Sequence, residues 1–144
     1  MHPYPHLYKT SASATQHSPV TVSSPGLDEL VTTPPPEFGG PEGHWSPETM
    51  LVASVANCFI LTFRAIARAS KVEWESLECE ADGTLDRAER VTCFTRFDLR
   101  ARLKLAPGMD PDKAERILHH AESVCLITAS LKADVHLETE IDTA

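Results

Sequence analysis

Cys58 and Cys125 are the two side chains of this 144-residue chain that could do chemistry of their own. A cysteine thiolate attacks peroxide oxygen or disulfide sulfur, and a second thiol can then close a disulfide with the oxidised one. Taken alone, each is most simply a small buried apolar residue. Cys79 and Cys93 fall in phase with the apolar residues of predicted strands, which favours packing for both. The residue types therefore permit thiol redox chemistry without requiring it.

The spacing of the four cysteines argues against a metal site. They are widely separated and form no Cys-x-x-Cys pair, so neither a zinc ribbon nor the disulfide framework of a small secreted domain is predicted. His119 and His120 are adjacent, and adjacent side chains on a helix point about 100° apart, unlike a chelating i, i+4 pair. We therefore expect no bound metal, and free thiols unless the cysteines react.

Composition and charge set the class of protein. Thirteen basic and 21 acidic residues give a net charge of −8, which argues against nucleic acid or an anionic membrane as the partner. Hydrophobic residues make up 42% of the chain, as in globular proteins, and the length suits a single domain over residues 1–144. The chain opens without a secretory signal, and the apolar stretch Met50–Phe63 is too short to span a bilayer. We expect a soluble, cytoplasmic protein.

A long helix must carry Cys58. Ser46 is a typical N-cap, Pro47 suits the first helical position, and Glu48 suits the positive end of the helix dipole. The pattern predicts a helix from this point to about Ser70. Its apolar residues point in nearly every direction, which is typical of a helix buried inside its own domain or between subunits.

Strands surround this helix in the sequence. The pattern predicts a loop over residues 34–45, a second helix from Asp110-Pro111 to about Cys125, and a short helical piece over 128–132. Three short strands are predicted over 7–14, 20–22 and 27–33, and a last strand over 135–141. Between them a hairpin is predicted, with strands 72–81 and 91–105 joined by a turn over Asp82–Arg90. Its first strand has a bulge near Ser76, and Phe94 is out of phase in its second. The fold class is α+β.

The surroundings of the two cysteines resemble the OsmC/Ohr family of thiol-dependent hydroperoxide reductases. The segment Ser46–Phe59 matches the family's Pro-Glu helix start with a Cys-Phe ten residues after the Glu, and Ser123–Val135 looks like its second cysteine region. The order of elements agrees over nearly the whole chain. The resemblance implies an OsmC-like fold, with antiparallel sheets around a long buried central helix, in an intertwined homodimer.

The same resemblance implies a peroxidase that needs no metal or organic cofactor. Cys58 would be the peroxidatic cysteine, Cys125 the resolving one, and Glu48 a catalytic glutamate. The substrates would be organic hydroperoxides and the reductant an external, lipoyl-type dithiol. An apolar substrate pocket would be built with Phe38, Leu51, Val55 and Phe59.

Two features complicate the activation of Cys58. Glu48 would lie roughly 15 Å from it along one straight helix, so either the helix starts later or the site forms across a dimer interface. Glu48 could also be a simple first-turn residue.

The family's arginine is missing from its usual loop, here Thr15–Pro19, and the first arginine, Arg64, is about 240° around the helix from Cys58. Leu126 replaces the proline that often follows the second cysteine.

Two other functions fit the same resemblance. The chain could be a non-catalytic OsmC-like domain that binds an apolar small molecule at the dimer interface, with the cysteines as packing residues or a slow redox sensor. It could also be a structural dimer in which Cys58 and Cys125 form a plain disulfide. A pKa of Cys58 well below that of a free thiol would favour catalysis, whereas a raised one would favour ligand binding.

Overall fold

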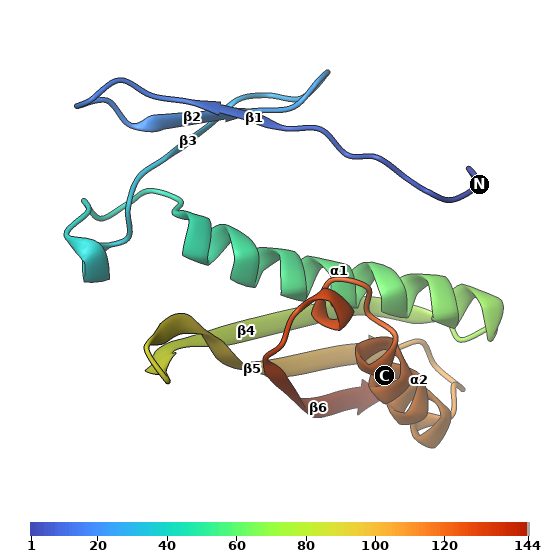
Figure 1. The fold of residues 1–144 in the computed structure, drawn as a ribbon. Coiled ribbons are helices and arrows are strands. Elements are labelled where there is room, and N and C mark those ends of the chain that lie inside the picture. Colours follow the sequence, from blue (N-terminus) through green and yellow to red (C-terminus); the bar gives the residue numbers. More distant parts are fainter. Residues whose placement is uncertain (144) are drawn as a thin grey trace. The chain divides into compact units, whose positions relative to one another are not determined.

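A computed structural model describes residues 1–143, which form two helices and two three-stranded sheets (Figure 1). This is the α+β class that the sequence predicts. The chain divides into two compact units, Met1–Met50 and a larger one that begins at Leu51. Each is described separately below, and the assignment of one domain to the whole chain stays a prediction.

The first unit is a small antiparallel sheet followed by a loop. Strands β1 (Ser11–Ser13), β2 (Val20–Ser23) and β3 (Leu30–Thr32) pair in chain order. The predicted strands exist, but β1 and β3 are shorter than predicted, because polar and turn-forming residues flank them, whereas β2 is one residue longer. The loop after β3 contains one short 3-10 turn, η1 (Pro36–Phe38), and the Thr33 N–H donates to the Trp45 carbonyl at 3.0 Å.

Helix α1 (Pro47–Ala69) starts where the sequence predicts and ends one residue before the predicted limit. Its first turn is closed by reciprocal bonds: the Thr49 N–H donates to Ser46 Oγ at 3.1 Å, and the Ser46 N–H donates to Thr49 Oγ1 at 2.9 Å. This hydroxyl pair satisfies N–H groups that a helix start otherwise leaves without partners. A later start for the helix is thereby excluded.

Only one face of α1 is buried within the chain. The residues that face the second sheet recur every fourth position and are wholly buried: Val55, Phe59, Phe63 and Ala67. On the opposite side Leu61 is 46% exposed. Burial inside its own domain is therefore wrong for this helix, because the sheet covers only one side of it, and burial of the other side between subunits stays a prediction.

The length of α1 changes the argument about membranes. Its 23 residues are long and apolar enough, by length and composition, to cross a bilayer, so the shortness of Met50–Phe63 does not exclude a span. The core helix of a soluble protein passes the same test. Here α1 packs its apolar stripe on a sheet, which is the arrangement of a soluble α+β fold.

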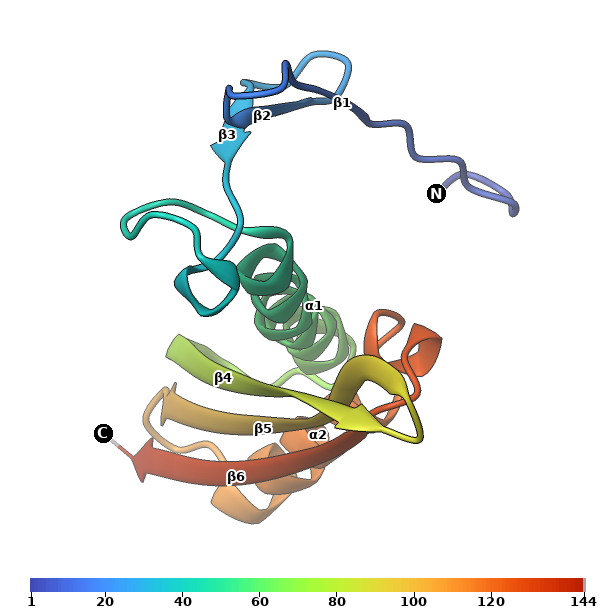
Figure 2. The ribbon, with the colours of Figure 1, turned by 60° about the vertical axis from the view of Figure 1, so that its left-hand side comes forward.

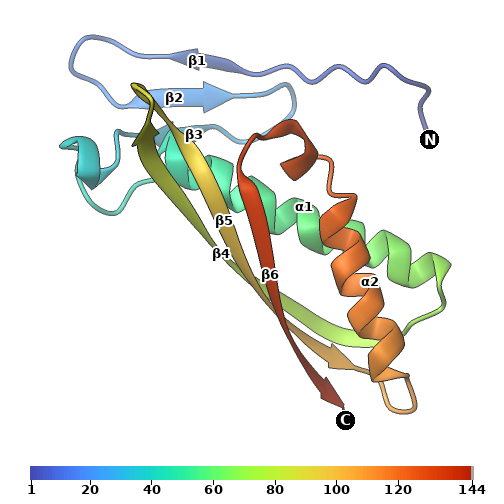
Figure 3. The same ribbon diagram turned by 60° about the horizontal axis from the view of Figure 1, so that its bottom comes forward.

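The second unit is a three-stranded sheet with the order β4-β5-β6. Strands β4 (Trp74–Ala88) and β5 (Val91–Leu105) are antiparallel, whereas β6 (Asp134–Thr143) runs parallel to β5. The expectation of antiparallel sheets is thus wrong for β6. The reason is the helix α2 (Pro111–Ser123), which carries the chain back to the starting end of β5, as a parallel connection requires (Figure 3).

The β4–β5 hairpin turns later than its sequence predicts. The strands continue to the two-residue turn Glu89–Arg90, both of which have positive φ, so the predicted turn over Asp82–Arg90 is wrong in extent. Gly83 lies inside β4, where a Cβ atom would be 2.7 Å from Val52 Cγ2. The glycine therefore permits close packing of the strand on α1 and does not mark a turn.

Two irregularities adjust the hairpin register. One falls between Trp74 and Ser76, close to the predicted bulge. The other lies opposite Thr84 and Leu85, which pair with Arg96 and Phe94, so that Thr95 is skipped. This extra residue shifts the phase of β5 and turns Phe94 toward the same core as Phe97, which explains why Phe94 is out of phase in the sequence. There Phe94 stacks on Phe97 with ring centroids 5.3 Å apart.

Both helices pack on the same face of this sheet, so its two faces have different surroundings (Figure 2). One face, with both helices, forms a single core, whose buried β5 members are Phe97, Leu99, Ala101, Leu103 and Leu105. The other face is charged and carries exposed ion pairs: Arg96–Asp98, Arg100 with Glu80 and Asp82, Arg102–Glu140 and Lys104–Glu75. Each exposed pair contributes little to stability, so the core face holds this unit together.

Candidate active site

Cys58 and Cys125 come together from different elements of the second unit. Cys58 lies in the middle of α1 and is half-buried, whereas Cys125 lies two residues after α2 and is 2% exposed. Both are free thiols, and each is among the groups that shift the pKa of the other. The fold therefore brings the two predicted redox residues close to each other.

A tight turn follows Cys125 and fixes the backbone around it. The 3-10 turn η2 (Thr128–Ser130) is held by two side chains: Thr128 Oγ1 donates to the Cys125 carbonyl at 3.2 Å, and Ser130 Oγ donates to the Leu126 carbonyl at 2.9 Å. The Ala129 N–H also donates to the Cys125 carbonyl, at 3.0 Å. These bonds fix the conformation of the segment that follows Cys125.

The pKa of Cys58 is lowered despite its burial. Burial is the largest influence and raises the pKa, because it penalises the thiolate. Hydrogen bonds from the Cys125 thiol, the Ile127 N–H, the Thr62 hydroxyl and the Leu126 N–H together outweigh it. Thr62 is one helical turn after Cys58, with 3.8 Å between Sγ and Oγ1. The result is a thiol with more nucleophilic character than an ordinary cysteine.

The pKa of Cys125 moves in the opposite direction. Burial raises it most, and the bond that Cys125 donates to Cys58 raises it further, whereas donors from Thr128 and Ile127 lower it only in part. Cys125 therefore stays protonated while Cys58 ionises. Two neighbouring thiols with opposite shifts have the polarity that a nucleophile and its resolving partner require.

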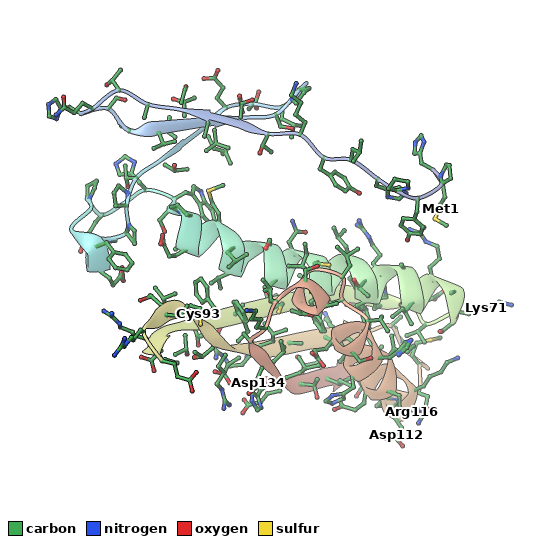
Figure 4. All side chains as sticks on the ribbon, viewed as in Figure 1. Met1, Lys71, Cys93, Asp112, Arg116 and Asp134 are labelled. Atoms are coloured by element: carbon green, nitrogen blue, oxygen red, sulfur yellow. The ribbon has the colours of Figure 1, made fainter. Side chains whose placement is uncertain are left out.

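The other two cysteines lie elsewhere. Cys79 belongs to β4 and is partly buried against the core, and burial raises its pKa to about 11. Cys93 is exposed on β5 close to the hairpin turn (Figure 4). The predicted packing role is confirmed for Cys79 and wrong for Cys93, because the register shift at Thr95 changes the phase of β5 and leaves Cys93 off the core face.

Glu48 lies in the first turn of α1, ten residues before Cys58 on the same helix. At about 1.5 Å per residue the two are separated by roughly 15 Å along the axis. One carboxylate oxygen of Glu48, Oε1, is buried and has no hydrogen-bond partner among residues 1–143. A buried carboxylate oxygen without a donor is unfavourable, so this atom needs a partner that the described chain does not supply.

The residues predicted to line a substrate pocket have different surroundings. Val55 and Phe59 are wholly buried in the core, and Leu51 is partly buried against it. Phe38 belongs to the first unit, at the end of η1, and is 60% exposed. A substrate pocket formed by these four stays a prediction.

The thiolate donors were missed by sequence reasoning, which looked for a cation. Arg64 is exposed on α1 and is not among the main influences on the Cys58 pKa. The hydroxyl of Thr62 could have been found, since it is four residues after Cys58 and thus on the same helical face. The backbone N–H groups of Leu126 and Ile127 leave no signal in the residue types.

Comparison with known proteins identifies the family. A sequence model of the family described as OsmC-like protein matches residues 39–140, which is most of the chain. The chain belongs to the OsmC-like protein family. The match includes both Cys58 and Cys125, and it confirms the resemblance inferred from the segments around them.

Three relatives illustrate the range of this OsmC-like family. The peroxiredoxin OsmC of Shigella flexneri is 25% identical over 104 residues, covering 72% of this chain and 71% of the relative. An OsmC-like protein of unknown function from Vibrio cholerae has the same fold, with a TM-score of 0.85 at 22% identity over 96% of this chain and 100% of the other. An organic hydroperoxide resistance protein OsmC from Legionella pneumophila matches with a TM-score of 0.73 at 25% identity, over 96% and 99%.

Proposed function

We propose that this OsmC-like protein is a thiol-dependent peroxidase that reduces organic hydroperoxides, with Cys58 as the peroxidatic and Cys125 as the resolving cysteine. The observation that carries the proposal is that the fold brings Cys125 close to Cys58, whose pKa is lowered although burial alone would raise it. A relative that is a peroxiredoxin and another that is an organic hydroperoxide resistance protein support the same reaction class.

The reaction has three balanced steps. The Cys58 thiolate attacks one oxygen of the hydroperoxide, so an S–O bond forms, the O–O bond breaks, and the leaving alkoxide takes a proton to become an alcohol. Cys58 is thereby oxidised to a sulfenic acid. The Cys125 thiol attacks its sulfur, a disulfide forms, and water leaves with the thiol proton. An external dithiol of the lipoyl type then reduces the disulfide by two exchanges and is itself oxidised to a disulfide.

A homodimer would complete the site. Glu48 cannot reach Cys58 of its own helix, and its Oε1 atom lacks a donor within residues 1–143. A second copy would supply that donor and would receive Glu48 beside its own reactive cysteine. The exposed side of α1, which includes Leu61, would become buried in the same assembly.

Apolar surroundings favour organic peroxides over hydrogen peroxide. Leu51 lies two helical turns before Cys58, on the same face of α1, and is only partly buried, so its side chain can contact the organic group of a substrate. An alkyl or aryl group gains free energy by leaving water for apolar surroundings, which hydrogen peroxide cannot do. We place this activity in the cytoplasm, where thiols are kept reduced.

The test is oxidation of the reduced protein by one equivalent of cumene hydroperoxide, followed by intact-mass measurement and peptide mapping. We expect rapid loss of two hydrogens and a Cys58–Cys125 disulfide. Cys58→Ser should abolish this reaction, and Cys125→Ser should stop it at a sulfenic acid that dimedone traps. If Cys58 oxidises no faster than free cysteine, the peroxidase proposal fails, and binding of an apolar molecule would take its place.

A further inference from the structure

The two cysteines of the candidate site differ in their access to solvent. Cys125 is 2% exposed, whereas Cys58 is only partly buried and lies beside the wholly buried stripe of α1, not within it. The residues on either side of Cys125 face solvent, since Val124 is 48% exposed and Leu126 is 68% exposed. The chain therefore turns the Cys125 sulfur inward at a point where its neighbours point outward.

Backbone hydrogen bonds on both sides hold Cys125 in this position. Its N–H donates to the Glu122 carbonyl at 3.3 Å, and its carbonyl accepts from the Ala129 N–H at 3.0 Å and from Thr128 Oγ1 at 3.2 Å. These partners belong to α2 and η2, so the residue is tied to the element before it and to the element after it. An attacking group can reach this sulfur only when the segment opens, and assembly with a second copy adds cover and removes none.

The Cys58 sulfur must be reachable if the proposed function holds. A hydroperoxide reacts only when one of its oxygens meets this sulfur, so an active assembly leaves a path to it. Once the Cys58–Cys125 disulfide has formed, the same path leads to the Cys58 sulfur of that disulfide. A small reductant that follows this path meets Cys58 first.

Building on the proposed peroxidase function, we propose that the external dithiol attacks the disulfide at the Cys58 sulfur, by the path that the hydroperoxide uses. One thiolate of the dithiol forms an S–S bond to Cys58, the Cys58–Cys125 bond breaks, and Cys125 leaves as a thiolate that takes a proton. The second thiolate of the dithiol then attacks the reductant sulfur of this mixed disulfide, so a cyclic disulfide forms and Cys58 leaves as a thiolate. The dithiol loses two electrons, which the protein disulfide gains, and its two protons pass to Cys125 and to solvent.

Leaving-group ability alone would favour the opposite sulfur in the first exchange. Burial raises the pKa of Cys125, which makes it the poorer leaving group, whereas Cys58 with its lowered pKa is the better one. Access decides the outcome, because a leaving group changes the rate of attack only at a sulfur that the attacking thiolate can reach. The second exchange releases Cys58 and therefore has the good leaving group.

The site of attack is tested on the wild-type disulfide, made with diamide so that no peroxide is needed. Mercaptoethanol, a monothiol, performs the first exchange and leaves a mixed disulfide. Acid quenching at early times and peptide mass spectrometry in acid should find the adduct on Cys58 and a free thiol on Cys125. An adduct mainly on Cys125 would overturn the proposal. Failure of the peroxidase function is distinguishable, because cumene hydroperoxide would then leave Cys58 unoxidised wherever the adduct lies.

Access is measured apart from leaving-group ability with three proteins that each retain one cysteine. Cys58, Cys125 or the exposed Cys93 is kept, Cys79 is replaced by alanine, and the others are replaced by serine. Each thiol is converted in urea to a mixed disulfide with thionitrobenzoate, the protein is refolded, and dithiothreitol then releases the same coloured leaving group from each.

Release from Cys58 should approach that from Cys93, the matched control for an exposed sulfur, and should exceed release from Cys125 by about tenfold or more. Concentrated urea should abolish the difference, because it removes the fold that shields Cys125. Equal release from Cys58 and Cys125 in proteins that circular dichroism shows to be folded would overturn the proposal. If the Cys125 adduct does not refold, the wild-type adduct decides alone.

Discussion

At the scale of single residues, reactivity depends on the balance between burial and hydrogen bonding. Burial raises the pKa of Cys58, Cys79 and Cys125, yet only Cys58 has enough donors to end below its ordinary value. The neighbouring groups of these three thiols, and not their burial, therefore decide which pKa is lowered. The sequence shows which residues are cysteines but not the order of their pKa values.

The first prediction is the order in which these thiols react. A lowered pKa means that Cys58 is thiolate at lower pH than a free cysteine, whereas Cys79, with a pKa of about 11, is thiolate in roughly one molecule in a thousand at pH 8. We expect iodoacetamide to modify Cys58 well before Cys79 and Cys125, measured by peptide mass spectrometry in a Cys93→Ser background between pH 6 and 10. A Cys58 rate that rises only above pH 9 would contradict this sorting.

The second prediction concerns Gly83. An alanine there would place its Cβ atom 2.7 Å from Val52 Cγ2 and 3.0 Å from Cε1 of Phe94 and of Phe97. Valine on a helix has one strongly preferred rotamer, so Val52 cannot turn away. We expect Gly83→Ala to lower the free energy of unfolding by about 1–3 kcal/mol in urea denaturation. Adding Val52→Ala should recover part of the loss, and no recovery would mean that the contact is not the cause.

At the scale of elements, the sequence predicts what local patterns determine. The cap at Ser46 and the start at Asp110 set both helices to within two residues, and the alternation after Phe97 sets the core face of β5. The hairpin turn was misplaced because Asp82-Gly83 is a stronger turn signal than Glu89-Arg90. The two cysteines of the site could be predicted from the residues around them. The groups that lower the Cys58 pKa could not, because some of them are backbone N–H groups, which nearly every residue type carries.

The third prediction follows from that turn. Glu89 and Arg90 have φ values of 50° and 70°, which non-glycine residues adopt at a cost. Asn-Gly is the preferred pair for a two-residue turn of this kind, so Glu89→Asn with Arg90→Gly should stabilise the protein by about 1 kcal/mol. The measurement is the midpoint of thermal unfolding. As a control, alanine at both positions should not stabilise, and equal midpoints for the two double variants would show that the backbone there is relaxed.

At the scale of the whole molecule, two features remain unsatisfied in one chain. The side of α1 opposite the sheet leaves Leu61 46% exposed, and Oε1 of Glu48 is buried without a partner among residues 1–143. A second copy would satisfy both at once, since it would cover the helix and bring a donor to the carboxylate. The proposed peroxidase is therefore expected to depend on assembly, even though its two cysteines belong to one chain.

The last prediction tests that dependence. If the exposed side of α1 lies in a homodimer, Leu61→Glu places a carboxylate twice in a desolvated, symmetric interface and should dissociate it. We expect sedimentation to give twice 15.8 kDa for the wild type and 15.8 kDa for the variant. Arg116→Gln, which changes the net charge by the same −1 at an exposed position of α2, is the control and should stay dimeric. The Leu61 variant should also oxidise more slowly with cumene hydroperoxide, because Glu48 of the proposed site would come from the partner. Its Cys58 should still react with iodoacetamide, because the groups that lower the Cys58 pKa belong to the same chain. A monomeric wild type, or a variant that remains dimeric, would contradict the role assigned to this face of α1.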